Sequence, residues 1–415
     1  MKVSYKFYRL LKLENIWFQK KLDILPLLLF FSFLLSPQIS AQLGNIEWEQ
    51  NFGGFETDKA KSIIETPDGG LAVAGFTESN SGDVADNEGQ KDYWILKLDA
   101  NGGIEWKKNY GGSQTEEAND IQITEDGGFI VAGYSNSNDG DLSGNIGGRD
   151  YWIVKLDVNG NIEWEQNYGG SSDDVAKSII ETLDGGFAVA GYSKSGDGDI
   201  DDNNIGGRDF WLLKLDVTGT IEWEHNYGGS QDEQAESFFQ TSGGGFALAG
   251  FSQSSNGDVN GNQGITDVWV LKLDQSGVIE WQQNYGGSNI DWAKSIIQTS
   301  DGGFAVAGWT ISNDGTIGGS PQFDDCWILK LSGIGTIEWE QNYGGLGIEH
   351  AFSIIETSDG NLGVAGWTTT SNNGDVGGSP ANEDYWFIKM DTTGNILWEE
   401  NYGGSFTDEA ASVVE

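Results

Sequence analysis

The stretch Ile162-Glu163-Trp164-Glu165-Gln166-Asn167-Tyr168-Gly169-Gly170-Ser171 returns along the whole of this 415-residue chain. Its tryptophan recurs every 58 or 59 residues, at Trp48, Trp106, Trp164, Trp223, Trp281, Trp339 and Trp398. One supersecondary unit has therefore been copied with almost no insertion or deletion. Because residues that repeat usually serve the repeat, we expect functional residues where one copy differs from its siblings.

Each unit contains two hairpins. The first consists of two short apolar runs around an Asp-Gly pair such as Asp184-Gly185, and this pair supplies the positive φ angles that tight hairpin turns require. In the second hairpin, Asp157 opposite Asn161 would place Lys155 across from Glu163, where opposite charges are stabilising. The same pairing is available for Lys97 with Glu105, Lys214 with Glu222, Lys272 with Glu280 and Lys330 with Glu338, whereas Lys389 would face Leu397.

Four strands per unit and no run of helical period predict an all-β fold, a β-propeller of four-stranded blades. The run Tyr151–Leu156 is apolar on both faces, as expected for a blade enclosed by its neighbours. A β-solenoid is the alternative, but solenoid coils are usually shorter. The repeat begins on a last strand and ends on a first strand, so we favour seven blades with the last incomplete, and six blades as the alternative. We also expect that the natural chain continues past Glu415.

The first 41 residues have a different composition. A basic leader precedes an apolar run, Ile24–Leu35, and then Ile39-Ser40-Ala41. This order predicts a signal peptide at 1–41 and a repeat domain at 42–415. The run is shorter than the roughly 18 residues of a membrane span, so a retained anchor is the less favoured alternative. We expect a secreted or outer-surface protein with no membrane span in the mature chain.

The charge balance excludes one class of partner. The formal net charge is −42, and it becomes −46 without the six Lys/Arg and two Asp/Glu of residues 1–41. Nucleic acid is bound through basic patches, so it is not expected as a partner. The acidity agrees either with solubility outside the cell or with cation binding. Cys326 is the only cysteine, so no internal disulfide can form.

The repeat resembles a family of secreted bacterial and archaeal proteins built from Tyr-Gly-Gly-Ser, Ser-Ile-Ile-x-Thr-x-Asp-Gly-Gly-Phe-x-Val-Ala-Gly, Asp-Tyr-Trp-x-x-Lys-Leu-Asp and Gly-x-Ile-x-Trp motifs. The resemblance covers residues 43–415. It implies a propeller-like exoprotein, often followed by a C-terminal sorting domain for type IX secretion. It brings no established catalytic residues.

One acidic position recurs in all seven copies, two residues before the alanine that opens each first strand. Its members are Asp58, Glu116, Asp174, Glu233, Asp291, Glu349 and Asp408. If the first strands are innermost, these carboxylates could form a ring at the channel mouth and attract a cation. Alternatively, each carboxylate accepts hydrogen bonds from the N–H groups of the preceding Gly-Gly turn.

The long loops between second and third strands are a second acidic feature. Oxygen side chains at alternate positions suit Ca²⁺, and the candidate ligands are Asp139, Asp141, Asp197, Asp199, Asp201 and Asp258. The loop from Asp197 begins like an EF-hand but has Asp202 where the turn glycine belongs and Arg208 where the bidentate glutamate belongs. Solvated Asp/Asn/Gly turns are the alternative. A further aspartate, such as Asp150, precedes each Trp-bearing strand and is expected to tie the loop to the strand backbone.

Thirteen of the 17 tryptophans occupy two repeat positions and are expected to form core between blades. The non-repeating residues Trp292, Trp309, Trp367, His350 and Phe323 are the candidates for a binding surface. With His225 and His350 as the only histidines, a Ser-His-Asp or Cys-His arrangement has almost no material.

These observations predict a non-catalytic, monomeric exported β-propeller that binds a glycan or a surface protein, with Ca²⁺ as the one cofactor considered. The alternative is a polysaccharide-active hydrolase with paired carboxylates at the channel mouth. The sequence does not identify the ligand.

Overall fold

The computed structural model describes residues 5–7, 48–84, 87–200, 206–318, 323–369, 374–377, 383–403, 408 and 410–415. Of the predicted signal peptide, only β1 (Tyr5–Phe7) is described, and it pairs antiparallel with β2 (Trp48–Gln50). None of the described residues belongs to a helix with the length and hydropathy of a membrane span.

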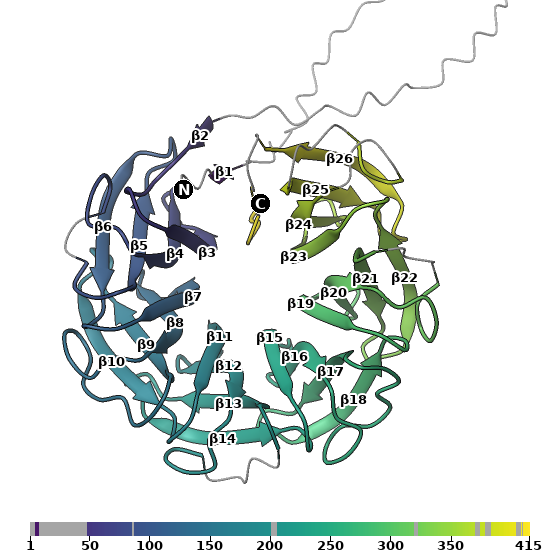
Figure 1. Ribbon diagram of the computed structural model, residues 1–415, viewed down its shortest axis with the longest axis horizontal. Coiled ribbons are helices and arrows are strands. Elements are labelled where there is room, and N and C mark those ends of the chain that lie inside the picture. The colour runs from purple at the N-terminus through teal and green to yellow at the C-terminus, as the bar shows by residue number, and fades with distance from the viewer. Residues whose placement is uncertain are drawn as a thin grey trace, which may run out of the picture.

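Six antiparallel four-stranded sheets surround a central axis as the blades of a β-propeller (Figure 1). The innermost strands are β3 (Asp58–Glu65), β7 (Glu116–Ile123), β11 (Asp174–Glu181), β15 (Glu233–Gln240), β19 (Asp291–Gln298) and β23 (Glu349–Glu356). The second strands are β4 (Leu71–Thr77), β8 (Phe129–Ser135), β12 (Phe187–Ser193), β16 (Phe246–Ser252), β20 (Phe304–Thr310) and β24 (Leu362–Thr368).

The third strands are β5 (Asp92–Leu98), β9 (Asp150–Leu156), β13 (Asp209–Leu215), β17 (Asp267–Leu273), β21 (Asp325–Leu331) and β25 (Asp384–Met390). The outermost are β6 (Ile104–Tyr110), β10 (Ile162–Tyr168), β14 (Ile221–Tyr227), β18 (Ile279–Tyr285), β22 (Ile337–Tyr343) and β26 (Ile396–Tyr402). The predicted β-propeller is confirmed, with six complete blades.

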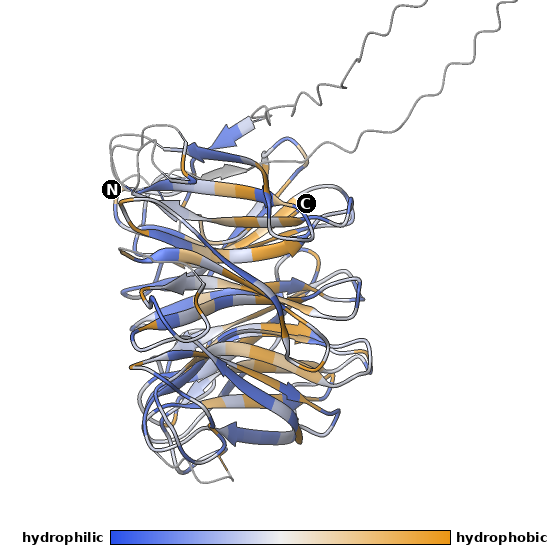
Figure 2. Ribbon diagram, turned by 90° about the vertical axis from the view of Figure 1, so that its right-hand side faces the viewer, coloured by the Kyte–Doolittle hydropathy of each residue, from blue (hydrophilic) through white to orange (hydrophobic). Residues whose placement is uncertain are grey.

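The core lies between blades, as predicted for the tryptophans of the third strands. Trp211 is fully buried and its ring packs 4.6 Å from that of Tyr151 in the preceding blade. The Tyr151 hydroxyl donates to the Trp211 carbonyl oxygen at 3.1 Å. Apolar burial is therefore shared by adjacent sheets, and Figure 2 shows apolar strand segments lying between polar ends. No blade completes its core alone.

Antiparallel order gives the ring two different faces. The Asp-Gly turns between first and second strands, and the turns between third and fourth strands, lie on one face, which we name the turn face. The Gly-Gly turns that link blades and the long loops between second and third strands lie on the other, the loop face. Figure 2 shows these connections at opposite edges of the ring.

The two ends of the repeat domain lie between the first and last blades (Figure 1). Glu415 accepts hydrogen bonds from the backbone N–H and hydroxyl of Ser358, as Glu356 does from Ser300 one blade earlier. Gly102 packs against the Trp48 ring, so that an added Cβ would lie 2.9 Å from the ring. Gly160 packs against Trp106 in the same way one blade later. Residues of the two ends thus make contacts of innermost and outermost strands at a seventh position. No described residues form middle strands there.

Candidate functional site

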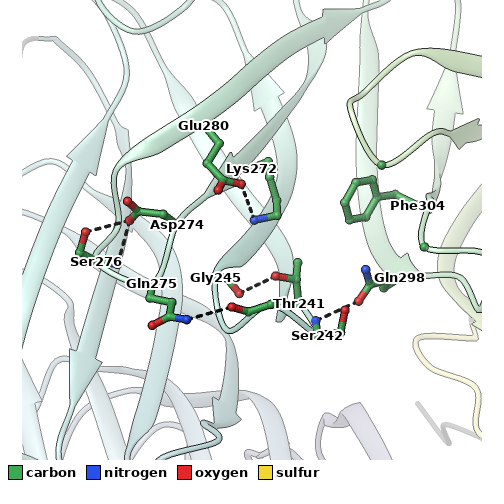
Figure 3. Close-up of a pocket in the computed structure, with 13 residues that line it drawn as sticks. Thr241, Ser242, Gly245, Lys272, Asp274, Gln275, Ser276, Glu280, Gln298 and Phe304 are labelled. Atoms are coloured by element: carbon green, nitrogen blue, oxygen red, sulfur yellow. Dashed lines mark hydrogen bonds and ion pairs between the residues drawn. The ribbon is translucent and has the colours of Figure 1, made fainter.

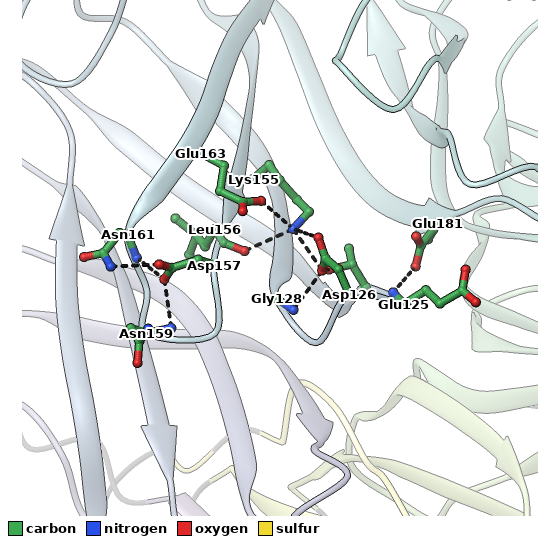
Figure 4. Close-up of polar contacts among 11 residues, drawn as sticks. Glu125, Asp126, Gly128, Lys155, Leu156, Asp157, Asn159, Asn161, Glu163 and Glu181 are labelled. Atoms are coloured by element: carbon green, nitrogen blue, oxygen red, sulfur yellow. Dashed lines mark hydrogen bonds and ion pairs between the residues drawn. The ribbon is translucent and has the colours of Figure 1, made fainter.

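A lysine network repeats on the turn face, and Figure 4 shows it in the second blade. Lys155 Nζ lies 2.9 Å from Glu163 Oε2 and 2.9 Å from Asp126 Oδ2, and it donates to the Leu156 carbonyl oxygen at 3.2 Å. The predicted ion pair is confirmed here and for Lys97–Glu105, Lys214–Glu222, Lys272–Glu280 and Lys330–Glu338, at 2.8–3.1 Å. Glu163 reaches the lysine from a bulge, because the β9–β10 register shifts between Ile162 and Trp164.

The aspartate of the Asp-Gly turn is a third partner that the sequence analysis missed. Hydrogen bonds from Thr299 and Lys330 lower the pKa of Asp301, the equivalent of Asp126, to about 2 despite partial desolvation. Lys389, which faces no glutamate, has this aspartate as its acidic partner among the described residues, with Nζ 2.6 Å from Asp359. The network is therefore part of the repeat.

The fourth blade lacks the aspartate, and a cavity of about 660 Å³ lies beside the altered turn. Figure 3 shows Lys272 paired with Glu280, while Gln275 Nε2 donates to the Gly243 carbonyl oxygen at 2.9 Å. Gln298 from the next blade accepts the Ser242 N–H at 3.2 Å. These polar groups bind one another, so the cavity presents few free hydrogen-bonding groups.

The acidic residues predicted at the channel mouth are bound to the Gly-Gly turns. In the six complete blades they are at most 4% exposed. One oxygen accepts the N–H of the second glycine of the turn at 2.6–3.0 Å, for Asp58, Glu116, Asp174, Glu233, Asp291 and Glu349. A strand hydroxyl adds a second bond, as from Ser135 to Glu116 at 2.8 Å. This geometry agrees with the alternative prediction, in which each carboxylate accepts a hydrogen bond from the preceding Gly-Gly turn. At Asp408 the backbone N–H donates to the Glu383 carbonyl oxygen.

The candidate calcium ligands also accept backbone hydrogen bonds from the Gly-Gly turns. Asp139 accepts the Ser113 N–H at 2.8 Å, and this bond lowers its pKa. The others form the same kind of bond: Asp141 with Gly111, Asp197 with Ser171, Asp199 with Gly169 and Asp258 with Gly228. Asp201 lies outside the described residues. Within the described ranges no group of three acidic, His or Cys side chains is arranged to hold a metal. Calcium binding stays a prediction.

The aspartates that open the third strands tie loop to strand, as predicted. Asp150 Oδ2 accepts the Ile146 N–H at 2.6 Å, while its buried Oδ1 has no hydrogen bond among the described residues. Burial raises the pKa of Asp150 to about 7. The hydrogen bond from Ile146 opposes this shift, whereas the negative charges of Asp174 and Asp199 add to it. The Asp150 carboxyl group therefore favours the protonated form well above the usual pH range of an aspartate.

Four of the five predicted surface residues lie together on the loop face, from the fourth to the sixth blade. With Phe251 they form what we name the aromatic strip: Phe251, Trp292, Trp309, His350 and Trp367. Successive ring centroids are 4.3, 5.9, 4.7 and 4.7 Å apart. Trp309 and His350 are stacked with an interplanar angle of 9°. Phe323 is 50% exposed in a loop, and no ring contact joins it to the strip among the described residues.

In each of the first three blades, a cationic side chain lies over the aromatic residue that is equivalent to Trp309. Lys91 lies over Phe76 at 4.2 Å, and Arg149 and Arg208 lie over Tyr134 and Tyr192, each at 4.7 Å. The three cations were not among the residues predicted from the sequence. Arg149 and Arg208 are, however, the only arginines after residue 41, and that rarity could have indicated them.

The six innermost strands enclose a channel cavity of about 1030 Å³. Its lining includes one residue from a bulge in every innermost strand together with residues of the C-terminal segment. This cavity lies on the axis that all six blades share.

The chain matches no protein-family model. A stretch of 185 residues, 41% of the chain, is 26% identical to the regulatory protein FlaEY of Caulobacter vibrioides and spans 19% of the length of that protein. Among solved structures, BamB from Moraxella catarrhalis is 15% identical with a TM-score of 0.41, over 88% of this chain and 82% of that chain. A Synechocystis apocarotenoid oxygenase is 11% identical with a TM-score of 0.44, over 89% and 75%. These likenesses concern the fold alone.

Proposed function

We propose that this chain is an exported, non-catalytic β-propeller that binds a glycan or a surface protein through the aromatic strip. The observation that carries the proposal is the stacking of Trp309 on His350, with ring centroids 4.7 Å apart. The repeat does not require this pair, because Tyr134 and Tyr192 stand at the position of Trp309 in other blades. Trp292, Trp309 and His350 are partly exposed, whereas Phe251 and Trp367 are buried beside them. The partly exposed rings offer flat apolar faces to a ligand.

A hydrolase would need two carboxylates that can reach substrate. Asp150 with Asp174 is one pair of neighbouring carboxylates that resembles an acid–base pair, since the pKa of Asp150 is raised to about 7. Asp325 with Glu349 is an equivalent pair, with the pKa of Asp325 also raised to about 7. The side chains of Asp150 and Asp174 are fully buried, and Asp174 is held by the Gly170 N–H at 2.9 Å. The geometry of this pair therefore supports a binding module over an enzyme.

The test is binding and turnover of a polysaccharide panel by the secreted protein. Trp309→Ala should weaken glycan binding at least about tenfold, because Trp in a binding centre is often a hot spot. Phe55→Ala is the control, since Phe55 is 86% exposed and outside the strip. Equal binding by both variants would contradict the proposal. Turnover that a single Asp or Glu substitution abolishes would establish the hydrolase instead.

We propose in addition that Ca²⁺ stabilises the long acidic loops, as the alternating oxygen side chains suggest. A ligand that binds only the folded state raises the melting temperature. Millimolar Ca²⁺ should therefore raise the melting temperature of the chelated protein, and Asp197→Asn should reduce that shift. Identical melting curves in chelator and in Ca²⁺ would contradict this proposal.

A further inference from the structure

Every innermost strand carries one bulge, and the bulged residue lines the channel. The register with the second strand shifts at the same point in all six blades, as between Ala176 and Ser178 in β11. The residues at the shift are Lys61, Asn119, Lys177, Glu236, Lys294 and Phe352, and all six line the channel cavity. A bulge directs its extra side chain away from the regular pleat. The channel lining is thereby free to vary from blade to blade.

The carboxylates in this lining are supplied with donors from the protein. Glu236 Oε1 lies 2.7 Å from Lys294 Nζ and also accepts bonds from Trp292 Nε1 at 3.1 Å and Gln234 Nε2 at 2.8 Å. Asp120 accepts the hydroxyls of Ser62 and Ser178 and the Ile179 N–H, at 2.8–3.1 Å. Burial also raises the pKa of Asp120.

Two cations nearby are not balanced in this way. Among the described residues, Lys177 has neither a hydrogen bond nor an ion pair, although Glu236 and Glu117 influence it at longer range. Burial lowers the pKa of Lys177, because removing the charged ammonium from water is unfavourable. Arg208 donates through Nη1 to Gln234 at 3.2 Å, while its buried Nε has no partner within the described chain. A partly buried cation that lines a cavity and has no counter-ion is stabilised by an anion that reaches it.

The position of these cations is unusual for a chain with net charge −42. Both arginines of the repeat domain lie over Tyr134 and Tyr192, outside the cavity lining, and Arg208 is near enough to Lys177 to influence its charge. We propose that the ligand of this channel is an acidic saccharide, whose carboxylate or sulfate groups bind Lys177, Arg149 and Arg208. Guanidinium groups suit such planar or multi-oxygen anions. This inference rests on the proposed function and adds the charge of the ligand.

The aromatic strip continues into this cluster, so one ligand can contact both. Trp292 belongs to the strip, donates to Glu236, and has Lys294 Nζ 4.2 Å above its ring. An acidic oligosaccharide can place sugar rings on the strip and its charged groups on the cations across the channel. A neutral glycan would leave Lys177 unbalanced. An acidic peptide would share the charges but has fewer flat faces for the strip.

The experiment measures binding of four probes to the full chain at low and moderate salt: polygalacturonate oligomers, sulfated galactan oligomers, neutral dextran oligomers and polyglutamate. The variants are Lys177→Gln, Lys177→Arg and the control Lys107→Gln, which removes the same charge from the exposed face of β6. We expect an acidic saccharide to bind, Lys177→Gln to weaken it about tenfold, and both other variants to leave affinity within about twofold. Added salt should weaken binding to the wild type more than to Lys177→Gln.

The outcomes separate the two proposals. Equal affinity for neutral and acidic saccharides, or no effect of Lys177→Gln, would overturn the inference and leave glycan binding intact. Binding of polyglutamate alone would overturn the saccharide class and the glycan function together. No binding by any probe would overturn the inference together with the glycan part of the proposed function. Carboxylated and sulfated oligomers, compared directly, show which anion the site takes.

Discussion

Lys155 and Lys177 lie in neighbouring blades, yet their surroundings are opposite. Lys155 is 5% exposed between Asp126 and Glu163, and a lysine stands at its position in every blade. Lys177 lines the channel and has no such partner among the described residues, and its equivalents in other blades include Asn119, Glu236 and Phe352.

The difference follows from strand pairing. Lys155 sits in β9, which is hydrogen-bonded on both sides, and its two acidic partners come from adjacent turns of the same blade. Any change there would disturb the whole blade. Lys177 is the extra residue of a bulge, outside the ladder, so its identity is free to serve a ligand.

The largest effect should come from Lys155→Met. This variant keeps the length of the side chain but leaves Asp126 and Glu163 close together without the ammonium. Since the two carboxylates are 58% and 45% exposed, we expect a loss of about 2 kcal/mol in the free energy of unfolding, less than for a fully buried pair. Urea unfolding measures it, with Lys107→Met as control. If Lys155→Met loses no more stability than the control, the lysine network does not stabilise the fold.

The next effect concerns pH. The pKa of Asp150 rises to about 7 on folding, so the native state keeps a proton that the unfolded chain loses near the ordinary value of 3.8. Its contribution to stability is greatest below pH 4 and declines as the pH rises to about 7. Asp150→Asn cannot ionise and should stabilise the protein at pH 8 by on the order of 1 kcal/mol. Unfolding curves at pH 5 and pH 8 test this. The expectation fails if the free energy of unfolding changes by the same amount between the two pH values in the wild type and in Asp150→Asn.

A smaller gain is expected from restoring the missing aspartate in the fourth blade. A Cβ on Gly243 would meet nothing within 4 Å, so Gly243→Asp fits and offers Lys272 its second acidic partner. We expect a gain of about 0.5–1 kcal/mol from the ion pair and the lower entropy of the unfolded chain. Thermal melting measures it. Leu397→Glu is the matched change beside Lys389, and no gain in either variant would show that the third partner is dispensable.

The smallest effect should come from Lys177→Met, in contrast to Lys155→Met. Because the Lys177 ammonium has no hydrogen bond or ion pair among the described residues and its burial is unfavourable, the free energy of unfolding should change by less than about 0.5 kcal/mol or rise slightly. The same urea titration decides it. A loss as large as that of Lys155→Met would make Lys177 a structural residue.

Much of the fold could be predicted because its causes are local. The alternation of apolar residues, the Asp-Gly turns and the constant spacing of Trp164 and its equivalents predict hairpins and identical blades, and the structure has both. The ion pair of Lys155 with Glu163 could also be predicted, because the two residues are only eight positions apart across one turn. Asp126, 29 positions away, could not be assigned, since strand order in space decides its approach.

The sequence by itself determined the repeat, the β-propeller and the residues that break the pattern. Only the tertiary structure decided which of those residues meet. Trp309 and His350 come from consecutive blades and stack because the packing of these blades brings β20 beside β23. The bulges that line the channel and the loop-face carboxylates held by Gly-Gly turns likewise depend on pairing between strands. Local patterns fix the blade, whereas the site is made by packing one blade against the next.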